Sequence, residues 1–193
     1  MGTIERKKPP QKIRVTSLQE AQLRDLVKIE ERVAQQRFEA GIAPELISVR
    51  SDTEIAKLRH GRDVYGAETD HEPAGYMAWA DQPPGVAVLE VLMVDPEMQR
   101  YGIATRLLRE LGEKATSHGI PVVVWATWGR DKTELAFLAK RGFMPAEAGQ
   151  LHERVTEWRE AAGAEWIQDG QKLWWAKSDG LGLIPGLPRP EPE

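Results

Sequence analysis

The chain has 193 residues, of which 41% are hydrophobic and 29% are charged, as is ordinary for a globular domain with a sizeable core. Its net charge of −4 argues against nucleic acid as a partner. The absence of cysteine excludes disulfides, catalysis by a cysteine thiolate and metal sites with thiolate ligands. No apolar run is long enough to span a membrane and the N-terminal stretch lacks a signal-peptide core, so we expect a soluble, cytoplasmic protein without a membrane partner.

The hydrophobic pattern predicts strands and helices along most of the chain. Strands are expected where apolar residues alternate or run together, and helices where they recur every three to four residues. Ser17 and Ser51 each stand three residues before a glutamate, which is the spacing of a capping box at a helix start. The charged residues of the two helices that follow are expected to form a solvated face.

The order of the predicted elements indicates a mixed α/β protein. In chain order they are a strand at 12–16, helices at 17–41 and 51–61, strands at 63–68, 74–80 and 86–94, a helix at 102–115, a strand at 121–128, helices at 131–142 and 147–162, and a hairpin of strands at 165–168 and 171–177. Because the strand at 121–128 is apolar on both faces, it should lie centrally and parallel to the strand at 86–94. Asp169-Gly170 is a strong two-residue hairpin signal.

The stretch from Glu90 to Leu111 joins an apolar strand, a polar turn and an amphipathic helix. The strand breaks at Asp95-Pro96, and helical spacing begins at Gly102. Such a helix start brings several free backbone N–H groups and the positive end of the helix dipole to one point. It is typical of an anion site, most often for phosphate. A strand–turn–helix crossover of some other α/β protein is the alternative interpretation.

Residues 99–104, Gln-Arg-Tyr-Gly-Ile-Ala, resemble the Q/R-x-x-G-x-G/A signature of the GNAT superfamily of acyl-CoA-dependent N-acyltransferases. The strand that ends at Asp95-Pro96 and the pair Leu107-Leu108 are also similar to that family. Further on, Arg141-Gly142-Phe143 resembles the Gly-Phe that closes the family's next helix. Ala104 stands where many members have glycine.

The resemblance implies a GNAT-like fold: a central, twisted, mostly antiparallel sheet of about seven strands, splayed between strands 4 and 5 and flanked by helices. One domain is then expected at 12–179, between a flexible lead-in at 1–11 and a proline-rich tail at 180–193. In that family a strand follows the Gly-Phe at once, so the helix at 147–162 is expected to be an insertion before the last hairpin.

The resemblance also implies where acetyl-CoA, the acyl donor, would bind. Its pantetheine and thioester would pair with backbone groups of the fourth strand, and its pyrophosphate would meet N–H groups of the signature loop. The first set is Leu92, Met93 and Val94; the second is Arg100, Tyr101, Gly102, Ile103, Ala104 and Thr105. Gly102 would let the backbone approach the phosphates closely. Arg100 would add a positive charge, unless it is simply a surface arginine.

Glu90 is the candidate catalytic base, because it is the only acid within the apolar run from Val86 to Val94. Burial would raise its pKa towards neutrality, which suits a group that takes a proton from an amine. It could instead be a satisfied polar residue on the sheet or an anchor for the substrate amine. By analogy with the family, the N–H of Leu92 or Met93 would stabilise the developing oxyanion.

The chain departs from the family where a leaving-group acid is expected. Many members carry Asn and Tyr at the positions of Asp131 and Leu138, so the tyrosine that would protonate the thiolate is missing. The leading hypothesis is an N-acetyltransferase that moves the acetyl group of acetyl-CoA to a primary amine by direct attack in a ternary complex. The alternative is a catalytically weak acyl-CoA-binding module that serves in regulation or assembly.

The acceptor is expected to be a small-molecule or peptide amine, and the residues do not select between them. Trp79, Trp125 and Trp128 near the strand ends could line its pocket, and the resemblance places Trp174 and Trp175 in the last strand, beside the fifth. Large aromatics in strands are more often core residues. The four histidines lack metal-ligand spacing, so no metal is expected. Exposed strands and the added helix are consistent with a homodimer.

Overall fold

The structure is a computed structural model that describes residues 12–18, 20–41, 47, 49–58, 60–69, 72–127, 132–147, 151–161, 167 and 171–181. Within the helices, the side chains of residues 20–22, 24, 132 and 133 are outside this description. The predicted lead-in at 1–11, most of the tail, Trp128, the capping residue Asp131 and the turn Asp169-Gly170 also lie outside the described residues.

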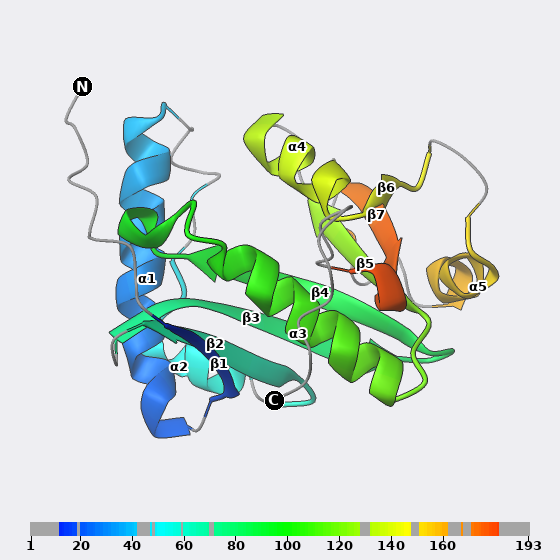
Figure 1. Ribbon diagram of the computed structural model, residues 1–193, viewed down its shortest axis with the longest axis horizontal. Helices are drawn as coiled ribbons and strands as arrows, with labels where there is room; N and C mark the ends of the chain where they lie inside the picture. The colour runs from blue at the N-terminus through cyan, green and yellow to red at the C-terminus, as the bar shows by residue number, and fades with distance from the viewer. Residues whose placement is uncertain are drawn as a thin grey trace. The chain divides into compact units, whose positions relative to one another are not determined.

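The described residues form a seven-stranded mixed sheet with helices (Figure 1). In chain order the elements are β1 (Ile13–Ser17), α1 (Glu20–Glu39), α2 (Asp52–Lys57), β2 (Asp63–Thr69), β3 (Glu72–Gln82), β4 (Val86–Val94), the 3-10 helix η2 (Pro96–Met98), α3 (Ile103–Ser117), β5 (Val122–Thr127), α4 (Lys132–Lys140), β6 (Met144–Pro145), α5 (Glu153–Ala161), β7 (Lys172–Lys177) and the 3-10 helix η3 (Ser178–Gly180). The strand order is β1-β2-β3-β4-β5-β7-β6. β4 and β5 are parallel, whereas β1–β2, β2–β3, β5–β7 and β6–β7 are antiparallel. The predicted fold class is confirmed.

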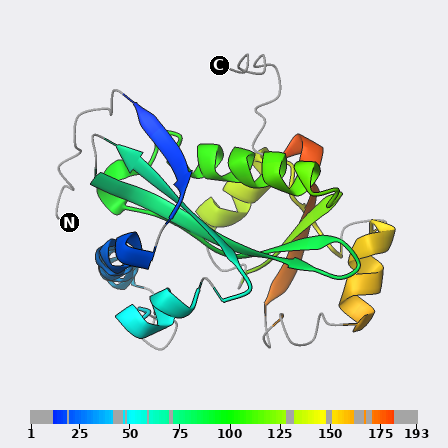
Figure 2. The same cartoon turned by 90° about the horizontal axis from the view of Figure 1, so that it is seen from below.

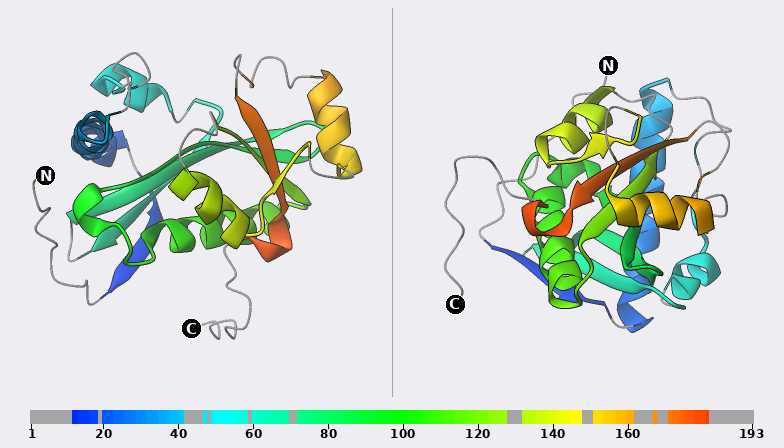
Figure 3. Two further views of the ribbon diagram at one scale, coloured as in Figure 1. Left: turned by 90° about the horizontal axis from the view of Figure 1, so that it is seen from above. Right: turned by 90° about the vertical axis from the view of Figure 1, so that its right-hand side faces the viewer.

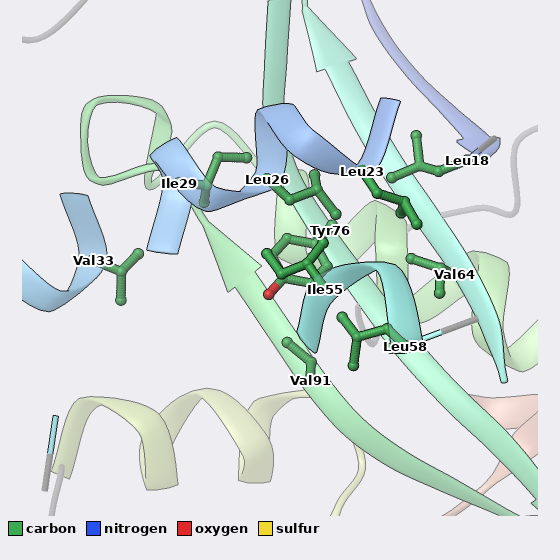
Figure 4. Packing of buried hydrophobic residues seen from close by; sticks show 11 residues of the cluster. Leu18, Leu23, Leu26, Ile29, Val33, Ile55, Leu58, Val64, Tyr76 and Val91 are labelled. Atoms are coloured by element: carbon green, nitrogen blue, oxygen red, sulfur yellow. The ribbon is translucent and has the colours of Figure 1, made fainter. Parts of the chain in front are cut away.

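The chain divides into two compact units, each with its own core. The first holds the described residues up to Trp79 together with Val91–Leu107. In it, α1 and α2 cover one face of β2 and β3 (Figure 2). The apolar side of α1 packs with residues from α2 and the strands in the cluster of Figure 4, made of Leu18, Leu23, Leu26, Ile29, Val33, Ile55, Leu58, Val64, Tyr76, Ala78 and Val91. The helical spacing of the leucines and isoleucines in α1 produces this core face.

The second unit holds residues 80–90 and the described residues from Leu108 onward. Here β5 pairs with β4 on one side and β7 on the other, and α4 and α5 lie on opposite sides of β5 and β7 (Figure 3). Val122 and Val124 of β5 share a core with Val155 and Trp158 of α5. On the other face, Trp125 meets the ring of Phe143 edge-on, 6.2 Å between centroids. β5 is apolar throughout because both of its faces are covered by other side chains.

The predicted start of the first helix was wrong, and one short strand was not predicted. Ser17 does not cap a helix: it is the last residue of β1, paired with Tyr65, and α1 begins only at Glu20. Ladder pairing with β2 therefore prevailed over the local capping signal, whereas the capping box of Ser51 and Glu54 is confirmed. The short strand β6 follows Phe143 at once and had been overlooked.

The overlooked strand β6 also changes how the next helix is interpreted. It spans only two residues, which is too short for a period-two hydrophobic pattern. Its second residue, Pro145, also lacks the backbone N–H that a strand residue would donate. The helix α5 comes after it and runs from Glu153, later than the predicted start at 147. The chain thus has the strand that the resemblance predicts after Phe143, and α5 is an additional helix between β6 and β7.

Candidate functional site

The turn after β4 is held by Asp95. The Asp95 backbone N–H donates to the Ala74 carbonyl at 2.9 Å, and its Oδ1 accepts from the Glu97 N–H at 3.0 Å, which caps η2. Met98 N–H donates back to the Asp95 carbonyl at 2.8 Å. The residue is 2% exposed, so a buried carboxylate organises the exit from the strand.

The loop between η2 and α3 is shaped by two residues in the left-handed region. Arg100 has φ +70° and Gly102 has φ +83°. For Arg100 this conformation costs on the order of 1 kcal/mol, so the surrounding structure must impose it. A Cβ built on Gly102 would meet no atom within 4 Å, and both residues are exposed. The space beside Gly102, the residue just before α3, is therefore open.

The first turn of α3 contains no acidic residue, and its backbone N–H groups have no acceptor within the helix. The first helical hydrogen bond runs from Arg106 N–H to Gly102 carbonyl at 3.0 Å, so the amides of Ile103, Ala104 and Thr105 precede it. The side chains of Ile103 and Thr105 are buried at 1% and 7% exposure, which anchors the helix start. Its amides and dipole suit an anion.

The strand β4 changes character along its length. Its residues Val86–Leu89 pair with β5 and are buried, whereas Leu92, Met93 and Val94 are each partly exposed. Val91 and Met93 pack towards the core of α1 and α2, so the side chains of Leu92 and Val94 point to the other face of the strand. The segment expected to meet the thioester is therefore the partly exposed end of β4.

A glycine in β3 lets this end of β4 pack closely. A Cβ on Gly75 would lie 2.7 Å from the carbonyl oxygen of Met93 and 3.1 Å from Cγ2 of Ile103. Real Cβ atoms do not approach a backbone oxygen that closely, so glycine is required at this position. The sequence interpretation did not single out Gly75, because the reason for it lies in a neighbouring strand.

Glu90, the candidate base, lies two residues before Leu92 in the same strand, β4, and is partly exposed. Tyr101 and Ala104 of the loop and helix start are also partly exposed. The predicted residues from Leu92 to Thr105 thus lie along one continuous strand–turn–helix, with Glu90 two residues before Leu92 in the same strand.

A buried charged cluster that sequence reasoning missed lies beside this segment. Glu30 of α1 is 1% exposed and accepts hydrogen bonds from the Tyr76 hydroxyl, the Arg50 backbone N–H at 2.6 Å and Arg50 Nη1 at 2.8 Å. The Tyr76 hydroxyl also lies 3.8 Å from Sδ of Met93. The prediction that the charged residues of the helix form a solvated face was wrong for Glu30.

The cluster keeps Tyr76 protonated and inaccessible. Burial, together with the charge of Glu30, raises the pKa of Tyr76, and the residue is 0% exposed. Figure 4 shows its ring among the apolar side chains of the cluster. Burial alone would lower the pKa of Arg50, but the hydrogen bond to Glu30 leaves it raised. Tyr76 is thus a buried donor and no substitute for the absent leaving-group acid, and the Leu138 side chain at that acid's expected position is also fully buried.

The tryptophans divide between core and partly exposed positions. Trp79 is 0% exposed and Trp175 is 7% exposed, as core residues are. Trp125 is partly exposed and stands directly across from Trp174 in the β5–β7 ladder. No group of three or more potential metal ligands gathers among the described residues, and no helix among them could cross a membrane.

Comparisons with known proteins agree with this geometry. Residues 23–143, more than half of the chain, match the model of the acetyltransferase (GNAT) family. Similar solved structures include a GNAT-family acetyltransferase from Staphylococcus aureus Mu50 (TM-score 0.66, 13% identity, 86% of this chain and 99% of that one). Another is the ribosomal-protein-S18-alanine N-acetyltransferase of Escherichia coli (TM-score 0.63, 16% identity, 92% and 100%).

A third similar structure is the PaiA N-acetyltransferase of Thermoplasma acidophilum, solved in complex with coenzyme A (TM-score 0.61, 15% identity, 86% of this chain and 99% of that one). No curated protein sequence matches the chain. At these sequence identities the solved structures show the fold alone, whereas the match to the family model shows that the chain is a member of the family. The chain belongs to the GNAT acetyltransferase family.

Proposed function

We propose that this protein is an N-acetyltransferase that moves the acetyl group of acetyl-CoA to a primary amine within a ternary complex. The observation that carries the proposal is the helix start, where left-handed Arg100 and Gly102, with open space beside Gly102, precede the first-turn amides of α3, which have no helical acceptor. Membership of the GNAT family and a similar fold solved with coenzyme A support an acyl-CoA donor.

The residues present fit such a donor. The open space at Gly102 leaves room for a pyrophosphate against the amides of the loop and first turn, from Arg100 to Thr105. Leu92, Met93 and Val94, which are partly exposed, would hold the pantetheine arm. The exposed Arg100 side chain adds a positive charge beside the phosphates.

The reaction needs one bond to form and one to break. The neutral amine nitrogen attacks the thioester carbonyl carbon, the C–S bond breaks, and CoA leaves as a thiolate. A backbone N–H at Leu92 or Met93 stabilises the charge on the carbonyl oxygen; losing such a donor costs roughly 2.7 to 4 kcal/mol of transition-state stabilisation. The proton of the amine passes to Glu90, directly or through water, because Glu90 stands in β4 two residues before the thioester segment.

The acceptor is a primary amine of a small molecule or a peptide. Thiol release measures the reaction well here, because the chain has no cysteine and contributes no thiol of its own. Purified protein would be incubated with acetyl-CoA and a panel of small amines, amino acids and peptides, with a thiol-reactive chromophore reporting free CoA. We expect release that depends on one class of amine.

A second function, an acyl-CoA-binding module with little turnover, is favoured by one observation. Leu138 stands where many members carry the leaving-group tyrosine, and it is fully buried. The same assay separates the two functions when it is combined with calorimetric titration of CoA. Tight CoA binding without thiol release over every amine would favour the binding module and rule out the transferase.

A further inference from the structure

Helix α1 is tied to the turn that leads into the signature loop by two side-chain pairs. Arg32 Nη1 donates to Asp95 Oδ2 at 2.5 Å. One helical turn later, the side-chain amides of Gln36 and Gln99 exchange two hydrogen bonds, of 3.0 and 3.4 Å. The partners are four residues apart on both segments, so the pairs lie next to each other along one face of α1. Figure 1 shows η2 beside this helix.

The first pair holds a buried carboxylate. The Asp95 side chain is 3% exposed and divides its two oxygens between Arg32 and the Glu97 N–H. The hydrogen bond to Asp95 and the charge of that carboxylate raise the pKa of Arg32, so the guanidinium keeps its positive charge beside Asp95. Removing the guanidinium would leave a buried negative charge with one neutral donor, and such a group relaxes by moving towards water.

The second pair holds the residue just before the left-handed Arg100. The backbone N–H of Gln99 makes a long bond of 3.4 Å to the Pro96 carbonyl, so the backbone alone restrains Gln99 weakly. The amide pair with Gln36 is partly buried and adds a side-chain restraint at this position. The direction of the amides from Arg100 onward depends on where Gln99 is held.

We propose that Arg32 and Gln36 are positioning residues for the acyl-CoA pyrophosphate: through Asp95 and Gln99 they hold the turn against α1 and so aim the loop amides. The inference rests on the proposed acyl-CoA site. Neither residue touches the ligand, and each acts through its partner. Their loss therefore weakens CoA binding while the protein remains folded.

The test is the dissociation constant of CoA, measured by isothermal titration calorimetry on the full chain. The variants are Arg32→Ala and Gln36→Ala, with Lys28→Ala as the matched control, since Lys28 lies one turn earlier on α1 and pairs with exposed Asp25. Circular dichroism first shows that each variant is folded at the temperature used. We expect each of the two variants to raise the dissociation constant about tenfold and the control to leave it unchanged.

Two further variants separate positioning from general damage. Arg32→Lys keeps the charge and should recover part of the lost affinity. If Arg32→Ala fails to fold, Gln36→Ala decides, because it removes no charge. In a double-mutant cycle, the variant that carries both Gln36→Ala and Gln99→Ala should bind CoA about as well as Gln36→Ala alone. Each substitution removes the same Gln36–Gln99 pair, so the second has nothing further to remove.

The outcomes separate this inference from the proposed function. If wild type binds CoA and both folded variants bind it equally well, the positioning role is wrong and the acyl-CoA site stands. Equal weakening by Lys28→Ala would show a general effect of altering α1 and would also overturn the role. Absence of CoA binding by wild type would remove the proposed function, and the inference with it.

Discussion

The carbonyl oxygen of Met93 lies where a Cβ on Gly75 would be only 2.7 Å away. This contact makes a glycine in β3 a requirement for the position of β4 at its partly exposed end. This end of β4 is also the proposed path of the thioester. The packing of β4 and the binding of the ligand therefore both depend on the absence of a side chain at Gly75.

Gly75→Ala is therefore expected to lower both stability and CoA affinity. The added methyl must push β4 or the start of α3 away, and such overpacking typically costs about 1–3 kcal/mol. Chemical denaturation gives the change in unfolding free energy, and calorimetry gives the affinity. Gly180→Ala is the control, because its Cβ meets nothing within 4 Å and its φ is not in the left-handed region. Wild-type values in Gly75→Ala would show that β3 and β4 do not need this close approach.

Gly102→Val is expected to abolish CoA binding while the protein still folds. The valine side chain would fill the open space in front of α3, and the left-handed backbone adds strain of roughly 1–2 kcal/mol. Gly61→Val is the matched control, since Gly61 is also left-handed at φ +72° with nothing near its Cβ. Both variants should lose similar stability, but only Gly102→Val should lose CoA binding in a titration. Retained binding would place the pyrophosphate elsewhere.

Glu90→Gln is expected to reduce turnover with little change in acetyl-CoA affinity. The amide keeps the size of the side chain but cannot take a proton, and loss of a general base costs on the order of a hundredfold in rate. Initial rates at neutral pH and the dissociation constant of acetyl-CoA check the two parts. Wild-type rates would assign the base to another group. A selective rise in the KM for the amine would assign Glu90 to amine binding.

Tyr76→Phe tests the buried cluster with Glu30 and Arg50. The variant removes one donor from a buried carboxylate and should destabilise the fold by about 1–3 kcal/mol. The pKa of Tyr76 is raised by burial, so the folded protein retains a proton that the unfolded chain releases near pH ~10. The stabilisation is then complete below that pH and is lost as pH rises further.

Denaturation curves between neutral pH and pH ~11 measure that loss. Wild type should lose free energy of unfolding above pH ~10 more steeply than Tyr76→Phe, because the variant has no hydroxyl to titrate. Parallel slopes would mean that the Tyr76 hydroxyl titrates alike in the folded and unfolded states. Such a result would contradict the burial of its hydroxyl against Glu30.

Most elements could be predicted from local signals. The strand β4 has its predicted bounds, the capping box of Ser51 is present, and Gly142 is left-handed after α4 as the predicted helix end requires. The failures at Ser17 and at β6 share a cause. Both are decided by strand pairing with distant residues, Tyr65 and Trp175, which local propensity does not report.

The sequence by itself determined the strand–turn–helix from Glu90 to Leu111, because an apolar run, Pro96 and Gly102 act on their immediate neighbours. Only the tertiary structure decided what surrounds it. Arg32 and Gln36 meet partners 63 residues away, and Gly75 is required by a carbonyl in the next strand. These contacts have no signature in the residues themselves, since they arise only when α1, β3 and β4 are packed together.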